Sequence, residues 1–217
     1  MLSNDQIYHI YTKSIAGYEI FNDDDEFQKM IQMIDYYQYE TQLKLSYFMK
    51  PKIIEKEGFY NALEIFSKDK ESIVQIIAYS LMPTHIHLII KQLKPNGISQ
   101  YMKKILDSYS RFFNLKHGRK GPLWESRFKN KLISTDELLL HITRYLHLNA
   151  VTAYLVDRPE NWLYSSYKEY LGETNDKSAF CHFNDVLDIN PVAYQKFVSD
   201  QIGYQRDLQK IKKLIIE

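Results

Sequence analysis

A β-branched, mostly apolar stretch from Ile73 to Ile90 constrains the fold of this chain more than any other feature. Its first nine residues include three isoleucines, a valine and a tyrosine, residue types that are enriched in strands. The interruption Met82-Pro83-Thr84 leaves room only for a tight turn, and its proline fixes one backbone angle. The stretch therefore predicts a β-hairpin whose second strand begins at His85.

Two histidines, His85 and His87, lie two positions apart in that second strand. A strand sends residues i and i+2 to the same face, so the two imidazoles project together, and Ile86 faces the other side. Two adjacent imidazoles on a rigid strand are a ready pair of ligands for a divalent ion. The simpler interpretation, two packed or exposed histidines, is the more frequent one for a lone His-x-His motif.

The remaining pattern alternates strands with helices. Residues 7–14 and 128–134 predict strands, residues 43–52 a further strand, and residues 52–72 a partly helical insertion. A first helix carries the apolar residues from Phe27 to Tyr37, with N-cap candidates in Asn22–Asp25. Further helices are expected over 99–115, capped by Ser99, and over 135–149, capped by Ser134 or Thr135. A turn at 158–162, a short helix over 165–171 and a tail of two short helices from 177 complete the chain. This order predicts an α+β fold with an antiparallel sheet backed by helices on one face.

The formal net charge of +1 hides a strong asymmetry. Residues 91–131 contain eleven Lys and Arg but only two acids, Asp107 and Glu125, so this segment carries +9 and the rest of the chain −8. Aromatic residues alternate with the cations, a composition suited to a polyanion whose bases stack on rings. The alternative, a solvated helical face with core aromatics, stays equally open. The candidate nucleic-acid contacts are Lys103, Arg111, Lys116, Arg119, Lys120, Arg127 and Lys129, with Trp124 as a stacking or core residue.

Several protein classes are disfavoured by composition. No apolar run is long enough to cross a bilayer, and the first residues lack the features of a secretory signal. Cys181 is the only cysteine, which excludes an internal disulfide and a cysteine-based zinc cluster. We therefore expect a cytoplasmic protein of one main domain with appendages.

The helix expected from Thr135 carries a second set of polar side chains. Glu137, His141, Tyr145 and Asn149 are four residues apart and share one face. A tyrosine phenolate can attack phosphorus and form a covalent phosphotyrosine, and the amide oxygen of Asn149 suits a hard metal ion. Together with the two histidines it would leave positions open for phosphate and water, as Mg²⁺ or Mn²⁺ requires. Most of the 18 tyrosines must be structural, and we expect His141 to line the helix or to position the phenol.

Four motifs in order resemble those of the IS200-like single-tyrosine (Y1) transposases, and most of all the REP-associated tyrosine transposases. The resemblance covers about residues 7–171, and its motifs are far more specific than His-x-His alone. They are Met-Pro-Thr-His85-Ile-His87-Leu, Gly121-Pro-Leu-Trp124-Glu-Ser-Arg127-Phe128, Arg144-Tyr145-Leu-His-Leu-Asn149 and Trp162-Leu-Tyr-Ser165-Ser166-Tyr167.

The resemblance implies a ferredoxin-like fold and an enzyme that cleaves and rejoins single-stranded, hairpin-forming DNA. In such enzymes a tyrosine leaves a 5′-phosphotyrosine and a free 3′-hydroxyl. His85, His87 and Asn149 would be the ligands of Mg²⁺ or Mn²⁺, and Tyr145 the nucleophile. Related chains often have Asn-Pro where this one has Asn149-Ala150, so the helix end is expected to differ.

Domain boundaries and alternatives follow from the same resemblance. Residues 1–172 would form the catalytic domain, with an insertion near 41–72, and residues 173–217 a helical extension. Whether one subunit or a homodimer builds the site stays open. A catalytically silent DNA-hairpin or RNA binder on the same fold is the main alternative. A two-histidine phosphoesterase would need a second His-x-Ser/Thr motif, and only His141-Ile142-Thr143 offers one, on an expected helix.

Overall fold

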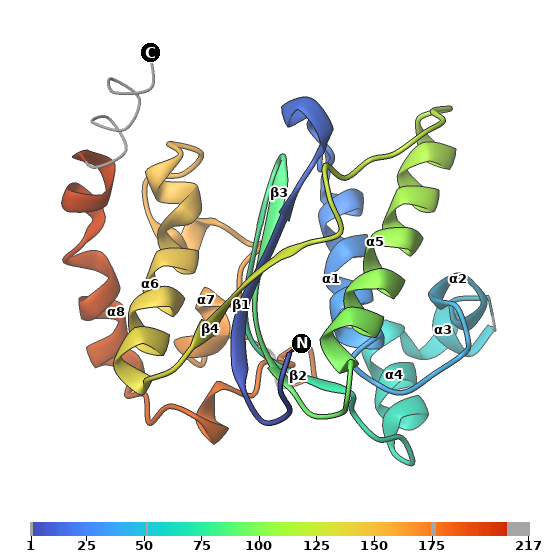
Figure 1. Cartoon of the computed structure of the whole chain (residues 1–217), viewed down its shortest axis with the longest axis horizontal. Helices are drawn as coiled ribbons and strands as arrows, with labels where there is room; N and C mark the ends of the chain where they lie inside the picture. Colours follow the sequence, from blue (N-terminus) through green and yellow to red (C-terminus); the bar gives the residue numbers. More distant parts are fainter. Residues whose placement is uncertain (1, 51, 175–176, 208–217) are drawn as a thin grey trace.

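The computed structural model describes residues 2–50, 52–174 and 177–207. Within them four antiparallel strands form a sheet in the order β2-β3-β1-β4 (Figure 1). The strands are β1 (Ile7–Lys13), β2 (Val74–Met82), β3 (His85–Gln92) and β4 (Lys129–Ile133). Helix α1 (Asp24–Tyr36) follows β1, and α5 (Gly97–Lys116) follows the β2–β3 hairpin. This order and topology confirm the predicted α+β, ferredoxin-like fold.

Helices cover both faces of the sheet. Helices α1 and α5 lie on one face, as predicted, whereas α6 (Asp136–Thr152), α7 (Tyr167–Tyr170) and α8 (Pro191–Ser199) lie on the other (Figure 1). Because successive strand residues point to opposite faces, β3 contributes Leu88 and Ile90 to the α1/α5 core and Ile89 to the α6 core. The ferredoxin-like core thus has its two helices on one face, and α6 adds a third layer over the other.

The segment between α1 and β2 is helical where a strand was expected over 43–52. It contains α2 (Leu45–Phe48), α3 (Lys52–Glu57) and α4 (Phe59–Ser67). Leu45 and Phe48 are both buried, and a spacing of three is that of one helical turn rather than of a strand. The prediction of a strand was therefore wrong here, because a short apolar run does not distinguish the two periods.

The start of α5 also differs from expectation. Its N-cap is Asn96, in the left-handed conformation and without a side-chain cap bond, so Ser99 does not cap the helix. The next residue, Gly97, has to be glycine because a Cβ there would lie 2.3 Å from the carbonyl oxygen of Ile73. Backbone contact between the helix start and the start of β2, not side-chain capping, determines where α5 begins.

The predicted starts of α1 and α6 are confirmed, whereas the short helix expected over 165–171 is α7, which begins at Tyr167. The side chain of Asp23 accepts from the backbone N–H of Glu26 at the start of α1, and that of Thr135 accepts from Leu138 at the start of α6. Short 3₁₀ turns lie at Ile15–Gly17 (η1), Pro159–Asn161 (η2) and Phe183–Asp185 (η3). In the described residues no helix is both long and apolar enough to cross a membrane.

The two edges of the sheet are treated differently. Beside β2, the backbone N–H of Leu81 donates to Tyr164 and that of His182 donates to Ile76, so later chain covers this edge. The opposite edge strand, β4, is five residues long and exposed from Lys129 to Leu132. A short edge strand bearing lysines resists pairing with another sheet.

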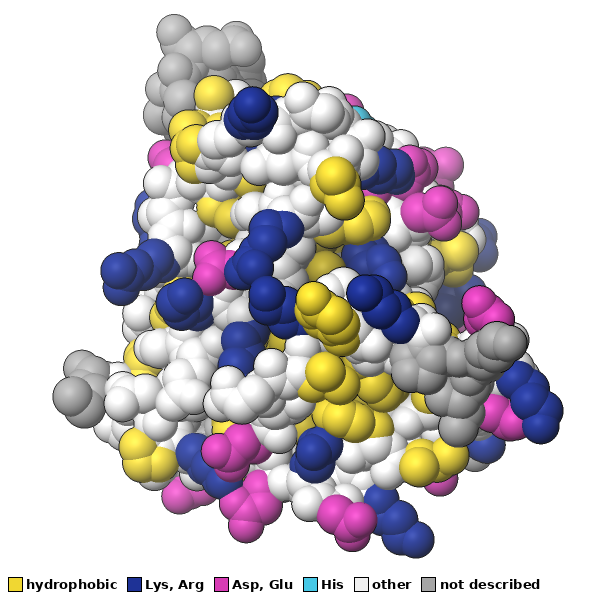
Figure 2. Space-filling model, turned by 90° about the vertical axis from the view of Figure 1, so that its right-hand side faces the viewer, with side chains coloured by type: hydrophobic (Ala, Val, Ile, Leu, Met, Phe, Trp, Pro, Cys, Tyr) yellow, Lys and Arg dark blue, Asp and Glu magenta, His cyan; other side chains and the backbone are white. Residues whose placement is uncertain are grey.

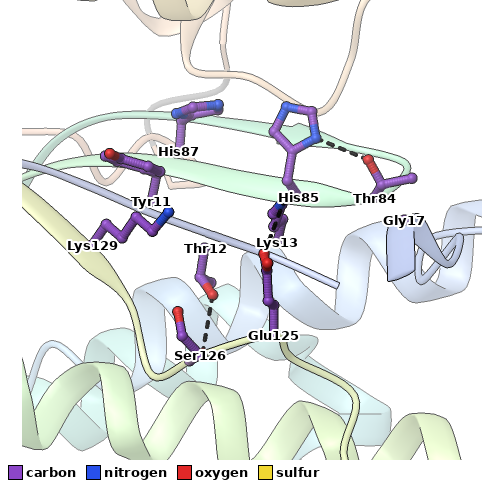
Figure 3. A pocket seen from close by; sticks show the side chains of 10 residues that line it. All are labelled: Tyr11, Thr12, Lys13, Gly17, Thr84, His85, His87, Glu125, Ser126 and Lys129. Atoms are coloured by element: carbon purple, nitrogen blue, oxygen red, sulfur yellow. Dashed lines mark hydrogen bonds and ion pairs between the residues drawn. The ribbon is translucent and has the colours of Figure 1, made fainter. Parts of the chain in front are cut away.

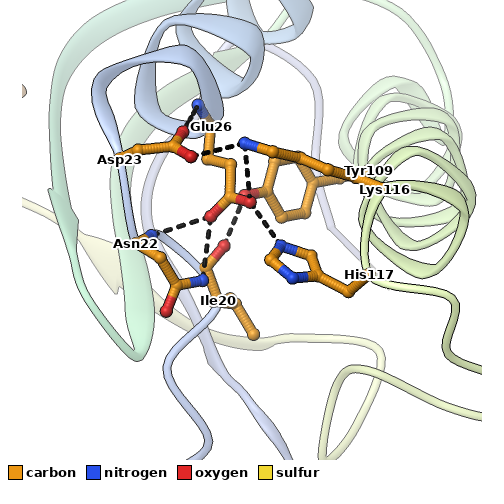
Figure 4. A network of polar contacts seen from close by, with 7 residues as sticks. All are labelled: Ile20, Asn22, Asp23, Glu26, Tyr109, Lys116 and His117. Atoms are coloured by element: carbon orange, nitrogen blue, oxygen red, sulfur yellow. Dashed lines mark hydrogen bonds and ion pairs between the residues drawn. The ribbon is translucent and has the colours of Figure 1, made fainter.

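A buried carboxylate joins the start of α1 to the end of α5 (Figure 4). Glu26 is 0% exposed, and its carboxylate accepts from the backbone and side-chain nitrogens of Asn22, from His117 and from Lys116. Burial acts to raise the pKa of Glu26, but the hydrogen bonds from Asn22, His117 and Lys116 outweigh it and hold that pKa below its ordinary value. The ionised carboxylate therefore stabilises the packing of α1 against α5.

Replacing Glu26 by alanine should lower the free energy of unfolding at pH 7 by roughly 1–3 kcal/mol, because the nitrogens of Asn22 and the partly exposed Lys116 and His117 lose their buried acceptor. Since the folded-state pKa of Glu26 is depressed, this contribution is present above its ordinary pKa of 4.5 and is lost as the pH falls through the folded-state value. Urea denaturation followed by circular dichroism measures both effects. Asp107→Asn, which removes only an exposed pair with Lys103, should cost less than about 0.5 kcal/mol. Equal losses in the two variants would contradict the role of Glu26.

Candidate functional site

The pairing of β1 with β3 assembles a polar cluster on the face covered by α6. Tyr11 lies opposite His87, and Lys13 lies opposite His85. Both imidazoles rise from the same side of the hairpin, with the Tyr11 ring close to His87 (Figure 3). The His85 and His87 ring centres are 5.1 Å apart and nearly perpendicular. The expectation that these two side chains share one face is confirmed.

A third histidine, His9, joins them, although the sequence reasoning gave it no role. Its Nε2 lies 2.9 Å from Nδ1 of His87. The available signal was the alternation His9-Tyr11-Lys13, which places these three side chains on one face of β1. Without the strand register, nothing in the sequence indicated that this face meets His85 and His87.

The other imidazole, that of His85, also has a neighbouring partner. Its Nδ1 lies 3.0 Å from the hydroxyl of Thr84, the last residue of the hairpin turn. Both imidazoles thus use Nδ1 for contacts within the protein. Their Nε2 atoms are the nitrogens left for a ligand.

Burial keeps the three imidazoles neutral. It lowers the pKa of His9 to about 4, with Lys131 contributing. Burial, together with His85 and His9, lowers the pKa of His87 well below its ordinary value, and burial with Lys13 lowers that of His85. A neutral imidazole has the lone pair that a metal ligand requires, so this donor chemistry fits a divalent cation.

Helix α6 brings Tyr145 to the same cluster. Its ring lies edge-on to His87, with ring centres 5.9 Å apart, and 6.4 Å from the ring centre of His9. The side chain is 43% exposed, so a substrate can reach it from solvent. Burial of the phenol, with Tyr11 nearby, raises the pKa of Tyr145 above its ordinary value, and the resting phenol is therefore neutral.

A buried histidine fixes the position of α6. His147, two residues after Tyr145, lies 2.7 Å from the hydroxyl of Tyr194 on α8 and 2.9 Å from that of Ser166. Ser166 in turn donates to the carbonyl of Tyr79 on β2 and accepts from its backbone N–H. The side of α6 opposite to Tyr145 is thus hydrogen-bonded to both the sheet and the C-terminal segment.

Asn149 lies one turn beyond Tyr145 and is 8% exposed. Its amide nitrogen is buried without a hydrogen-bond partner. The hydroxyl of Ser80, which lies opposite His87 in the β2–β3 register, is likewise buried without one. Unpartnered buried polar atoms are rare and indicate an additional binding partner. The N–H group of Asn149 would need an acceptor and does not itself bind a cation, so a metal contact from this side chain would come from its amide oxygen.

The candidate metal ligands here are imidazoles and an amide rather than carboxylates. In the described part of the chain no group of three or more His, Cys, Asp or Glu side chains is arranged to hold a metal ion. A third protein ligand beside His85 and His87 would therefore be an amide such as that of Asn149. Two imidazoles and an amide oxygen leave positions for phosphate and water, which suits Mg²⁺ or Mn²⁺.

The four polar residues that were expected to share one face of α6 do not all point to the same neighbours. His141 accepts from Arg144 and packs its ring against Phe197 of α8, away from the histidine cluster. Residues four apart rotate by about 40° around a helix at each step. Over two steps this rotation is enough to direct His141 and Asn149 differently, so His141 lines the helix.

The basic residues lie in two places. Lys and Arg side chains gather over the face formed by α5 and the neighbouring helices, with acidic side chains mostly toward its rim (Figure 2). There Lys103 pairs with Asp107, Lys116 pairs with Asp23 and Glu26, and Arg119 bonds to Asn114 and Pro122. This face is opposite to the one that bears the histidines.

Arg111 and Trp124 lie on the same α5 side. Arg111, with Phe112, borders a groove of about 420 Å³ between α1, α2 and α5. Trp124 is partly buried against the core and donates its indole N–H to the carbonyl of Leu106, which favours its structural role. Lys120 and Arg127 are exposed in the connection between α5 and β4.

Two lysines of β4 lie on the histidine face instead. Lys129 pairs with Tyr11 and Lys131 with His9, so their side chains follow those residues to the side of α6. Lys129 borders a pocket of about 220 Å³ with Tyr11, His85 and His87 (Figure 3). Lys13 also lines this pocket, paired at 3.1 Å with Glu125. The pocket combines neutral imidazoles with cations and suits a bound phosphate.

Two comparisons with known proteins gave a match. The family model described as transposase IS200 like matches residues 35–149. A solved structure, that of a REP-associated tyrosine transposase bound to a REP hairpin, matches with a TM-score of 0.54 and 14% sequence identity, over 88% of this chain and 93% of the other. No protein of curated function matches at a significant level. At this identity the structural match shows the shared fold.

Because His9 has a pKa of about 4, its ring should remain neutral throughout the range from pH 5.5 to 8. Its NMR resonances should show no titration step there, and the ring should take up a proton only as the pH falls toward 4. A two-dimensional ¹H–¹⁵N spectrum of the ring nitrogens, recorded across this range with His9→Gln used to assign the signals, measures it. A midpoint near the ordinary value of 6.5 would contradict the buried, neutral cluster.

Proposed function

This chain belongs to the IS200-like transposase family, and from that premise we propose that it cleaves and rejoins single-stranded DNA through a covalent 5′-phosphotyrosine. The observation that carries the proposal is the contact of Tyr145 with His87 within one chain, 5.9 Å between ring centres. A partly exposed phenol beside a pair of metal-ligating groups is the arrangement that attack on phosphorus requires.

In this proposal His85, His87 and Asn149 hold Mg²⁺ or Mn²⁺. Lowered imidazole pKa values, and the place of Asn149 one turn beyond Tyr145 on α6, support this ligand set. When bound, the ion supplies positive charge to the scissile phosphate and to the departing 3′-oxygen. Lys129, which borders the same pocket, contacts a phosphate oxygen and helps to place the strand.

The chemistry assigns one attacking atom to the protein. Oη of Tyr145 attacks phosphorus and loses its proton to solvent, the bond from phosphorus to the 3′-oxygen breaks, and the 3′-oxygen takes up a proton. In the reverse step a 3′-hydroxyl attacks the phosphotyrosine and restores the phenol. The phosphotyrosine conserves the bond energy, so the reaction needs no nucleotide cofactor.

The DNA substrate is proposed from charge and from the similar structure. Lys129 and Lys131 lie beside the histidines, so a strand that crosses β4 would bring a phosphate to the pocket. The similar structure holds a REP hairpin, and we propose hairpin-forming DNA as the substrate. The cations on the α5 side, including Lys103 and Arg111, would contact only DNA that continues around the molecule.

The proposed catalytic unit is residues 1–172, and residues 173–217 form the C-terminal extension. Within the described residues the extension packs on α6 through Tyr194. A homodimer is compatible with the site but not required by it, because Tyr145 and His87 meet in one chain.

Tyr145→Phe should bind DNA with unchanged affinity but form no covalent adduct, because it lacks the attacking oxygen. A labelled hairpin oligonucleotide with a single-stranded flank, incubated with Mn²⁺ and analysed on a denaturing gel, measures the adduct. Tyr154→Phe, which alters an exposed tyrosine just beyond α6, is the matched control and should form adduct normally. An adduct formed by Tyr145→Phe would remove this residue from the mechanism, and wild-type protein that binds the hairpin without an adduct would favour the catalytically silent binder.

Lys129→Gln should weaken DNA binding and reduce its salt dependence, because one phosphate contact is lost. For a single strand, each lost contact lowers the slope of log K against log salt by about 0.7. Fluorescence anisotropy between about 50 and 200 mM salt, concentrations over which this term is large, measures the slope. Lys196→Gln, on the exposed side of α8, should leave it unchanged. Identical slopes for the wild type and both variants would show that the DNA strand does not cross β4.

A further inference from the structure

Resting on the metal site of the proposed function, we infer that His9 is a positioning residue. It accepts the Nδ1 proton of His87 and thereby keeps Nε2 of His87 free to bind the divalent ion. His9 itself touches neither the ion nor the substrate in this arrangement. Thr84 does the same for His85 on the other side of the site.

The geometry between His9 and His87 is that of a direct hydrogen bond. Nε2 of His9 and Nδ1 of His87 are 2.9 Å apart, within the normal range. The ring centres are 5.1 Å apart, and the ring planes differ by only 22°. At this separation the two nearly coplanar rings meet edge to edge through these nitrogens. A ring-nitrogen lone pair lies in the ring plane, so the lone pair on one nitrogen points at the other nitrogen.

Proton counting then fixes the direction of the bond. A neutral imidazole carries one proton, on Nδ1 or on Nε2. His87 must have an unprotonated Nε2 to ligate, so its proton is on Nδ1 and is donated to His9. His9 must accept at Nε2, and therefore carries its own proton on Nδ1. The nitrogen of His9 that faces the site is occupied by this bond, which is why His9 is not a third ligand.

The contact between His85 and Thr84 repeats the arrangement. Nδ1 of His85 lies 3.0 Å from the Thr84 hydroxyl, which can accept its proton. Both imidazoles then present Nε2 to the same space, although their outer partners come from different elements, β1 and the hairpin turn. Partners of this kind orient a ligating histidine, and losing one typically costs about 10- to 100-fold in metal affinity.

The strand register explains why His9 occupies this place. His9 lies opposite Ile89, and Tyr11 lies opposite His87, so His9 and His87 form a diagonal pair on one face. Diagonal neighbours in an antiparallel sheet are within reach of aromatic side chains. Thr84, by contrast, reaches His85 simply as its neighbour in the chain.

The test is the affinity of the full-length, DNA-free protein for Mn²⁺, measured by isothermal titration calorimetry. His9→Phe keeps the ring but removes the acceptor, and should weaken Mn²⁺ binding by about 10- to 100-fold. His9→Gln retains an acceptor oxygen and should recover part of the loss, which a purely structural role would not produce. Thr84→Val should weaken binding similarly, and His182→Phe, a histidine of the C-terminal segment, should bind as the wild type does.

A second measurement reads the tautomer directly. The two-bond ¹H–¹⁵N spectrum of metal-free wild-type protein should show His87 protonated on Nδ1 and unprotonated on Nε2. A proton on Nε2 of His87, or equal Mn²⁺ affinity for His9→Phe and the wild type, would overturn the inference and leave the proposed function intact. Wild-type protein that binds no Mn²⁺ would overturn the metal site itself, and the inference with it.

Discussion

The antiparallel register between β1 and β3 is the constraint on which the site depends. It places Tyr11 opposite His87 and Lys13 opposite His85, and it brings His9 to the diagonal position from which it reaches His87. Because the side-chain period of a strand is two, a slip of β1 by one residue would turn His9, Tyr11 and Lys13 to the α1/α5 core, away from the two histidines of β3. That core holds Ile10, Ile86 and Leu88, so the same apolar burial that stabilises the sheet also fixes the polar cluster on its other face.

The position of Tyr145 depends on hydrogen bonds made by the opposite side of α6. Tyr145 faces the histidines, while His147 on the same helix is enclosed by Ser166 and Tyr194. Burial lowers the pKa of His147 to about 3, so this ring stays neutral and acts as a hydrogen-bonding link rather than as a charge. The polar side chains of α6 therefore have two roles: Tyr145 is proposed to react with the substrate, and His147 attaches the opposite side of the helix to the sheet and to α8.

Sequence reasoning recovered the hairpin, the shared face of His85 and His87, and the position of Tyr145 because each depends on local periodicity or on specific motifs. It missed His9 and the placement of Lys131 because both depend on which strands pair and in what register. It assigned 43–52 to a strand because a short apolar run fits either period, and it expected Ser99 to cap α5, where the close approach of Gly97 to Ile73 decides instead. It also did not predict that the basic residues of 91–131 lie on two faces of the molecule. They do so because the chain passes from α5, on one face of the sheet, into β4, whose lysines point to the other face.

Because the tyrosine and the histidines of the cluster belong to one polypeptide, their contact forms by a unimolecular step. A site shared between subunits would be populated only in proportion to the assembled fraction, which declines on dilution. Here the encounter of Tyr145 with His87 is completed when the chain folds. A single molecule therefore contains Tyr145 together with the three histidines of the cluster.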